Sequence, residues 1–164
     1  MRTMLGRALS PGTAEPPVRP PWHDGPLPAQ VQMLDRLTDG SIGPLHPLAA
    51  DVVRAVAQTA HPRPNVATVA RALGCSVREL ERRFARAELP PPLRLVVLTR
   101  WLVVARSMGV PGATTRQSAR QSGFASSQAF CRAVHREVHL SVTELRCPAT
   151  QERLVRDLLT AYPR

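Results

Sequence analysis

The sequence of 164 residues contains no lysine, so all 22 of its basic residues are arginines. With 12 acidic residues the formal net charge is +10, which favours partners rich in phosphate. Arginine adds a planar set of N–H donors that can pair with a phosphate group or with the edge of a guanine. Thirteen arginines and only five glutamates lie between Asn65 and Arg146, a net +8, so the charge is concentrated in this part of the chain.

Long apolar runs and paired cysteines are also missing. The three cysteines are odd in number and have no CxxC spacing, which argues against a disulfide framework or a zinc knuckle. No uncharged apolar run approaches the roughly 18 residues of a membrane helix, and the N-terminus lacks the apolar core of a signal peptide. Three arginines interrupt the most apolar stretch, residues 93–108, which predicts a buried helix. We therefore expect a soluble protein of the cytoplasm.

Catalytic motifs are absent as well. The sequence has no recognisable triad, carboxylate pair or phosphate-binding loop. One pattern has metal-ligand spacing, the i, i+4, i+8 ladder of Cys131, His135 and His139, but no fourth ligand accompanies it. We expect no metal, no cofactor and no enzyme activity.

The order of helix signals indicates an all-α fold. Seven prolines in the first 28 residues predict that residues 1–45 form a disordered or weakly structured tail, with one short helix at 30–38. Capping residues, prolines and apolar periodicity then predict helices at 47–60, 66–73, 77–87, 93–108, 114–121, 127–138 and 150–161. Four apolar residues of the last helix form a stripe, which we expect to pack on the preceding helices; a dimer interface is the alternative.

Two of these helices share a pattern. Helical periodicity turns two apolar residues inward and the arginine between them outward in Leu80-Glu-Arg82-Arg-Phe84 and in Phe130-Cys-Arg132-Ala-Val134. A short helix precedes each, with Ala70 or Ala119 near its middle and Gly74 or Gly123 four residues later. A small residue at the crossing and a glycine in the turn are typical of a helix-turn-helix unit. One such unit is a weak signal, but two in tandem predict a protein that places helices in DNA grooves.

These pieces, "VATVARALGCSVRELERRF" and "SARQSGFASSQAFCRAVHREVHLSVTELR", joined through Pro92 and "RWLVVA", resemble the DNA-binding domain of the AraC/XylS family of transcription regulators. The resemblance implies a domain at 46–148, with helix-turn-helix units at 65–87 and 114–139 and a linker helix at 92–108. Residues 149–164 then form a separate C-terminal amphipathic helix. The sixteen residues 93–108 of the linker helix span about 24 Å. With the width of the two units, this helix could set the two reading helices near the roughly 34 Å between successive major grooves.

The resemblance also assigns roles to residues. Those expected to read bases are Arg78, Arg82, Gln128 and Arg132. Those expected to contact phosphates are Ser76, Arg83, Arg86, Ser126, Ser127 and Arg136. Phe84, Trp101, Gly123 and Phe124 are expected to be architectural. Glutamates beside the arginines of the first reading helix leave intrahelical ion pairs as an alternative role for some of them.

The chain departs from the family pattern in several places. Thr115 and Ser118 stand where apolar residues are usual, and unpaired buried hydroxyls each cost about 1–3 kcal/mol, so we expect the second unit to be loosely folded alone. Further departures are Leu89 and His139 in place of glycine and Val142 in place of proline. About 45 residues precede the first domain helix, too few for the family's effector-binding domain. We therefore expect a stand-alone member or a fragment of a longer regulator.

The sequence thus predicts a nucleoid-associated transcription regulator that binds double-stranded DNA through two successive major-groove segments. RNA polymerase is a further candidate partner, a membrane is not, and a monomer is favoured. The alternative is a degenerate helical module that binds RNA polymerase or another regulator without reading DNA.

Overall fold

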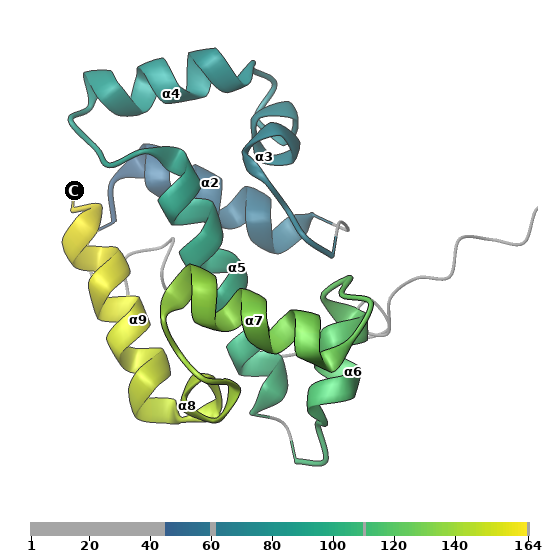
Figure 1. Ribbon diagram of the computed structural model, residues 1–164. Helices are drawn as coiled ribbons and strands as arrows, with labels where there is room; N and C mark the ends of the chain where they lie inside the picture. The colour runs from purple at the N-terminus through teal and green to yellow at the C-terminus, as the bar shows by residue number, and fades with distance from the viewer. Residues whose placement is uncertain (1–44, 60–61, 110, 164) are drawn as a thin grey trace, which may run out of the picture.

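The computed structural model describes residues 45–59, 62–109 and 111–163, so the expected helix at 30–38 and nearly all of the N-terminal tail lie outside the described residues. Within these ranges the chain forms eight α-helices and no strand, which confirms the all-α class (Figure 1). They are α2 (Pro47–Gln58), α3 (Val66–Ala72), α4 (Val77–Arg86), α5 (Pro92–Met108), α6 (Thr115–Gln121), α7 (Ser127–Val138), α8 (Val142–Arg146) and α9 (Pro148–Ala161).

The helix starts follow the capping residues of the sequence. Asn65, Ser76, Thr114 and Ser126 each occupy the N-cap position, and each side-chain oxygen accepts a hydrogen bond from the backbone N–H three residues later. These bonds satisfy N–H groups that a helix end leaves without a partner. The predicted boundaries of α3, α4, α6 and α7 are therefore correct to within a residue.

The central helix α5 organises the core. It packs against each of the other seven helices, and nine of its seventeen residues are buried. In Figure 1 α5 runs through the middle of the molecule, with α2, α3 and α4 gathered around its first half and α6, α7 and α8 around its second half. The described residues contain no helix with the length and apolarity needed to cross a bilayer.

Helix α9 connects the two halves. Near its start, the buried Gln151 donates its amide to the carbonyl oxygens of Ala105, 3.1 Å away on α5, and of Leu145, 3.3 Å away on α8. At its other end, Tyr162 packs edge-on against Phe84 of α4, with 6.3 Å between ring centroids. Of the apolar stripe of α9, Leu154, Val155 and Leu158 are buried within the monomer and Leu159 is half-buried, as the packing interpretation predicts.

The sequence analysis did not predict helix α8. Helix α8 begins with a capping box in which the side chain of Ser141 accepts from the N–H of Glu144 and the Glu144 carboxylate accepts from the N–H of Ser141. The S-x-x-E spacing was a visible signal for it. Val142, the departure from a family proline, occupies the first position of this helix, where proline is also favoured.

The two polar residues of α6 that depart from the family pattern both have hydrogen-bond partners. Ser118 is buried, but its hydroxyl donates to the carbonyl oxygen of Thr114 at 3.1 Å. The hydroxyl oxygen of Thr115 accepts from Arg146 at 3.4 Å. Because both groups have partners, the cost of unpaired buried hydroxyls does not arise, and the expectation of a loose second unit loses its physical basis.

Candidate nucleic-acid interface

The two turns of the tandem units have the same hydrogen-bond geometry. In the first, Gly74 has a φ of +68°, and the N–H of the next residue, Cys75, donates to the carbonyl oxygen of Ala70 at 3.0 Å. In the second, Gly123 has a φ of +71°, and the N–H of Phe124 donates to Ala119 at 2.9 Å. This is the Schellman ending of a helix, which favours glycine at the left-handed position.

The alanines of the two units are equivalent in packing as well. Ala70 and Ala119 are each 1% exposed, so no larger side chain fits where the short helix crosses its neighbour. From the caps Ser76 and Ser126 onward, residues of α4 and α7 correspond with a constant offset of fifty. The second turn is one residue longer than the first, because the glycines are only 49 residues apart. The chain therefore contains two matched helix-turn-helix units.

His139 and Leu89 both replace a family glycine, but only His139 adopts the left-handed conformation that favours glycine. His139 has a φ of +55°, so a left-handed residue is needed after α7 even though a glycine is absent. After α4 the left-handed residue is Glu88, with a φ of +53°, while Leu89 donates its N–H to the carbonyl oxygen of Phe84 at 3.0 Å. The first reading helix therefore ends one residue earlier than the family pattern implies.

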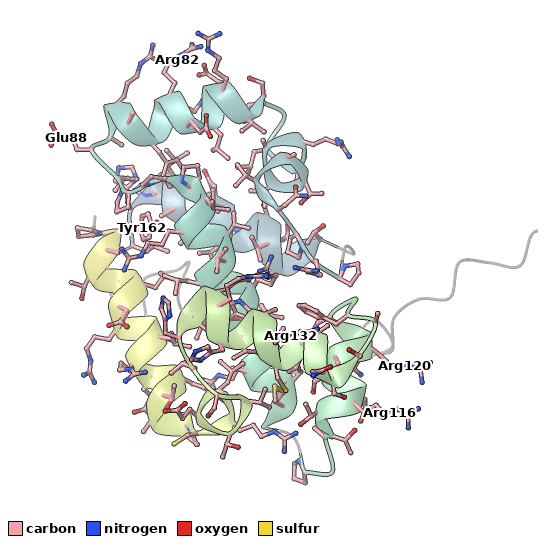
Figure 2. The ribbon with its side chains drawn as sticks, viewed as in Figure 1. Arg82, Glu88, Arg116, Arg120, Arg132 and Tyr162 are labelled. Carbon is pink, nitrogen blue, oxygen red and sulfur yellow. The ribbon has the colours of Figure 1, made fainter. Side chains whose placement is uncertain are left out.

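The residues expected to read bases lie on the outward sides of α4 and α7. Arg78, Arg82, Gln128 and Arg132 are all exposed. The opposite side of α4 buries Leu80 and Phe84, and that of α7 buries Phe130, Ala133 and Val134. Figure 2 shows Arg82 on the outer side of α4, pointing away from the body of the protein, and Arg132 on the uncovered near side of α7.

The residues expected to contact phosphates flank them. Arg83, Arg86 and Arg136 are exposed, as are the capping residues Ser76 and Ser126, while Ser127 is half-buried. The two caps use a hydroxyl lone pair to accept from the N–H groups of Glu79 and Ala129, each at 3.1 Å. Each hydroxyl keeps its O–H, which can donate to a phosphate oxygen.

Glu79 of α4 engages two of the arginines. Its carboxylate lies 2.8 Å from Nη1 of Arg82 and 3.1 Å from Nε of Arg83. The hydrogen bond from Arg83 lowers the pKa of Glu79 below its usual value, so this carboxylate is charged at neutral pH. The intrahelical pairing that the sequence left open thus occurs for these two arginines. The guanidinium of Arg132, the counterpart of Arg82, makes no hydrogen bond or ion pair with another residue in the described ranges.

Sequence reasoning missed the contacts that orient the second unit. Glu137, at the end of α7, accepts hydrogen bonds from the guanidinium of Arg100 and, at 2.9 Å, from Nε1 of Trp101. Arg63, from the loop before α3, lies 4.3 Å from the ring centroid of Phe124 and 3.9 Å from the Glu137 carboxylate. Nothing in the periodicity of α7 signals this role, because Glu137 follows exposed residues and precedes a half-buried valine.

Aromatic rings fill the space beneath these contacts. Trp101 of α5 meets Phe130 of α7 edge-on at 5.6 Å and stacks with Phe124 at 6.2 Å. All three rings are buried, and Phe84 is buried in the first unit. These positions match the architectural roles that the resemblance implied.

Two further arginines belong to the exposed surface of the second unit. Arg116 and Arg120 lie one turn apart on α6 and point away from the body of the protein (Figure 2). Arg120 corresponds to the exposed Arg71 of α3 by the same offset as the glycines. That repeat was present in the sequence and could have identified Arg120, but not Arg116, whose counterpart is Ala67.

The described part of the chain contains no cluster of three histidine, cysteine or acidic side chains placed to hold a metal ion. Cys131 and His135 are exposed on α7, and the third member of the ladder, His139, is exposed at the residue that ends this helix.

A protein-family model described as a helix-turn-helix domain matches residues 69–147. The match runs from within α3 to the residue after α8, so it includes both turns, the central helix α5 and the helices α4 and α7 that follow the turns. The comparison with curated proteins gave no match, and neither did the comparison with solved structures. Residues 69–147 therefore match an AraC-type helix-turn-helix domain, which supports a DNA-binding regulator of transcription.

Proposed function

We propose that this protein regulates transcription by reading two successive major-groove segments of one DNA duplex. The observation that carries the proposal is the matched pair of turns, each followed by a helix with an exposed arginine or glutamine face, on either side of α5. In Figure 1 α4 and α7 run in the same sense, from the side where α3 and α6 lie towards the side where α9 lies. Two parallel helices on one support suit two consecutive grooves of one DNA face.

In this proposal the side chains divide into two classes. Arg78, Arg82 and Arg132 pair with guanine edges and Gln128 with adenine, because these are the favoured geometries of their donors and acceptors. The serine caps and the arginines Arg83, Arg86 and Arg136 contact phosphates, which fixes the position of the protein without reading sequence. The first helix of a unit crosses the DNA backbone in this motif, so we add Arg116 and Arg120 to the phosphate class.

We place the protein at the nucleoid, where its DNA ligand lies, and we propose RNA polymerase as a further partner and a monomer as the binding form. The competing proposal of a module that binds only proteins rests on the polar residues of the second unit and on the proline-rich N-terminal tail, which lies outside the described residues. Since the hydroxyls of Thr115 and Ser118 have partners, the first of these observations no longer favours it.

The test is selection of binding sites from a random duplex library with the purified protein at about 150 mM salt, where non-specific phosphate binding is weakened. The proposal predicts a bipartite motif with half-sites about one helical turn, 10–10.5 base pairs, apart. A single short motif would restrict reading to one unit. Recovery of no motif, together with co-purification of a protein partner, would replace the proposal with the interaction module.

A further inference from the structure

The two matched helices α4 and α7 differ in the residue that faces their shared arginine, Arg82 or Arg132. Glu79 lies three residues after the cap of α4, and its counterpart in α7 is Ala129. The first reading helix therefore presents Arg82 with a carboxylate at 2.8 Å, while Arg132 in the second has no such neighbour. The two units share the same hydrogen bonds at their turns, but only the first has a carboxylate beside this arginine.

A comparison within the chain shows that this carboxylate is not used to cap its helix. Ser76 and Glu79 have the same S-x-x-E spacing as Ser141 and Glu144. In α8 the glutamate turns back to accept from the N–H of its cap, at 2.7 Å. In α4 the Ser76 hydroxyl oxygen accepts from the N–H of Glu79, as in a capping box. The Glu79 carboxylate, however, does not return to the cap but contacts Arg82 and Arg83. Glu79 thus belongs to the reading surface.

We propose that Glu79 is a specificity-determining residue of the first reading helix, which holds Arg82 in place for a base edge and opposes its use on phosphates. The inference rests on the proposed function, because it concerns how an exposed arginine of a DNA-reading helix chooses between two kinds of acceptor. It assigns sharper discrimination between specific and non-specific DNA to the first unit than to the second.

A guanidinium has enough N–H donors to contact a carboxylate and a base edge at the same time. Arg82 has five N–H groups, and the contact with Glu79 is made through Nη1, so others remain for the two acceptors of a guanine. Moving Arg82 to a phosphate requires breaking its contact with the Glu79 carboxylate and brings the phosphate near that negative charge. Non-specific binding comes almost entirely from phosphate contacts. Glu79 therefore weakens non-specific binding more than guanine recognition.

The experiment compares Glu79→Gln with Glu81→Gln. Both variants remove one negative charge from the same helix, but the carboxylate of Glu81 is exposed and makes no hydrogen bond or ion pair with another described residue. The dissociation constant of each variant is measured for the selected site and for a scrambled duplex at one salt concentration. We expect Glu79→Gln to lower the ratio of specific to non-specific affinity about two- to fivefold, the range for one exposed ion pair, and Glu81→Gln to leave it unchanged.

The same substitution made in the Arg82→Ala variant tests whether Glu79 acts through Arg82. When Arg82 is already alanine, Glu79→Gln is expected to behave like Glu81→Gln, because the guanidinium that it positions is gone. Circular dichroism melting of each variant confirms that the helices are retained. Equal ratios for the two glutamine variants would overturn the inference while leaving the proposed function intact. A native protein with no preference for any selected site would instead overturn the proposed function, and the inference with it.

Discussion

Glu137 at the end of the second reading helix accepts hydrogen bonds from both Arg100 and Trp101, consecutive residues of the central helix. Only 12% of the Arg100 side chain and 16% of the Glu137 side chain are exposed, so water competes little for these bonds. Burial lowers the pKa of Arg100, and the carboxylate of Glu137 opposes that effect. The relationship fixes α7 to α5 by a charged contact that has few alternative geometries.

The contribution of this contact can be measured with Glu137→Gln. The variant keeps an acceptor for Trp101 but leaves the Arg100 cation without its counter-charge, which we expect to cost about 1–3 kcal/mol in the free energy of unfolding. Urea denaturation monitored by circular dichroism gives the value. Arg136→Gln is the control, because Arg136 also contacts Glu137 but is 71% exposed, and it should change stability by less than about 0.5 kcal/mol. Equal effects of the two variants would contradict the role given to Glu137.

The two turn glycines form a second matched pair. Both have positive φ, so Gly74→Ala and Gly123→Ala should each destabilise by about 1–2 kcal/mol, the cost of a left-handed alanine. A Cβ at Gly74 meets nothing within 4 Å, whereas one at Gly123 would lie 3.2 Å from Cγ of Pro62. Gly123→Ala should therefore be the more costly of the two by thermal or urea denaturation. A larger loss for Gly74→Ala would show that the loop before α3 does not press on the second turn.

Tyr162 gives an optical test of how α9 docks. It is the single tyrosine of the sequence, and burial raises its pKa to about 12. Since the folded pKa is above the unfolded value of about 10, the stabilisation from the neutral phenol is complete below that value and is lost as the pH rises through about 12. Titration of tyrosinate absorbance should give the raised value.

The matched variant for that titration is Tyr162→Phe. It should unfold with less dependence on pH in the same alkaline window, because it has no phenol to ionise. It also loses the hydrogen bond from the Tyr162 hydroxyl to the carbonyl oxygen of Pro91. A tyrosinate titration near the ordinary value in the folded protein would mean that the end of α9 does not pack against α4.

Local chemistry explains which parts of the fold were predictable. Helix starts were predictable because the N-cap side chains of Asn65, Ser76 and Ser126 bond to backbone N–H groups only three residues later. Turns were predictable because the left-handed backbone conformation that ends a helix favours glycine, as at Gly74 and Gly123. Their helices were located to within a residue. Helix α8 was missed although its capping box is equally local, since only five residues of helix follow the cap.

Contacts between distant segments could not be read in the same way. Whether a glutamate on an amphipathic helix meets solvent or a buried arginine depends on how two helices cross, and Glu137 gives no sign of it in the sequence. The same holds for Tyr162 against Phe84 and for Arg63 over Phe124. The outward direction of the candidate base-reading residues was predictable from periodicity, whereas the capture of Arg82 and Arg83 by Glu79 was only one of two possibilities. The roles of these residues on DNA remain predictions.

Those roles can be separated by substitution. Arg82→Ala and Arg132→Ala should each cost about 1–3 kcal/mol of specific binding and relax the preference at particular base pairs of the selected site. Arg86→Ala should weaken binding to all sequences alike and reduce the dependence of affinity on salt. Binding to the selected site and to its single-base variants, measured for each protein, distinguishes these patterns. Uniform weakening by Arg82→Ala or Arg132→Ala would place that arginine in the phosphate class.

Helices α5 and α9 and the Glu137 contacts should together hold α4 and α7 at one fixed separation on one DNA duplex. The most direct measurement takes the selected bipartite site and inserts five or ten base pairs between its halves, about half a turn and about one turn of DNA. Half a turn moves the second half-site to the opposite face, and a full turn exceeds the fixed separation, so both insertions should reduce the affinity to that of one half-site. Affinity unchanged by either insertion would contradict the account, because it would require units that move independently or only one unit that binds.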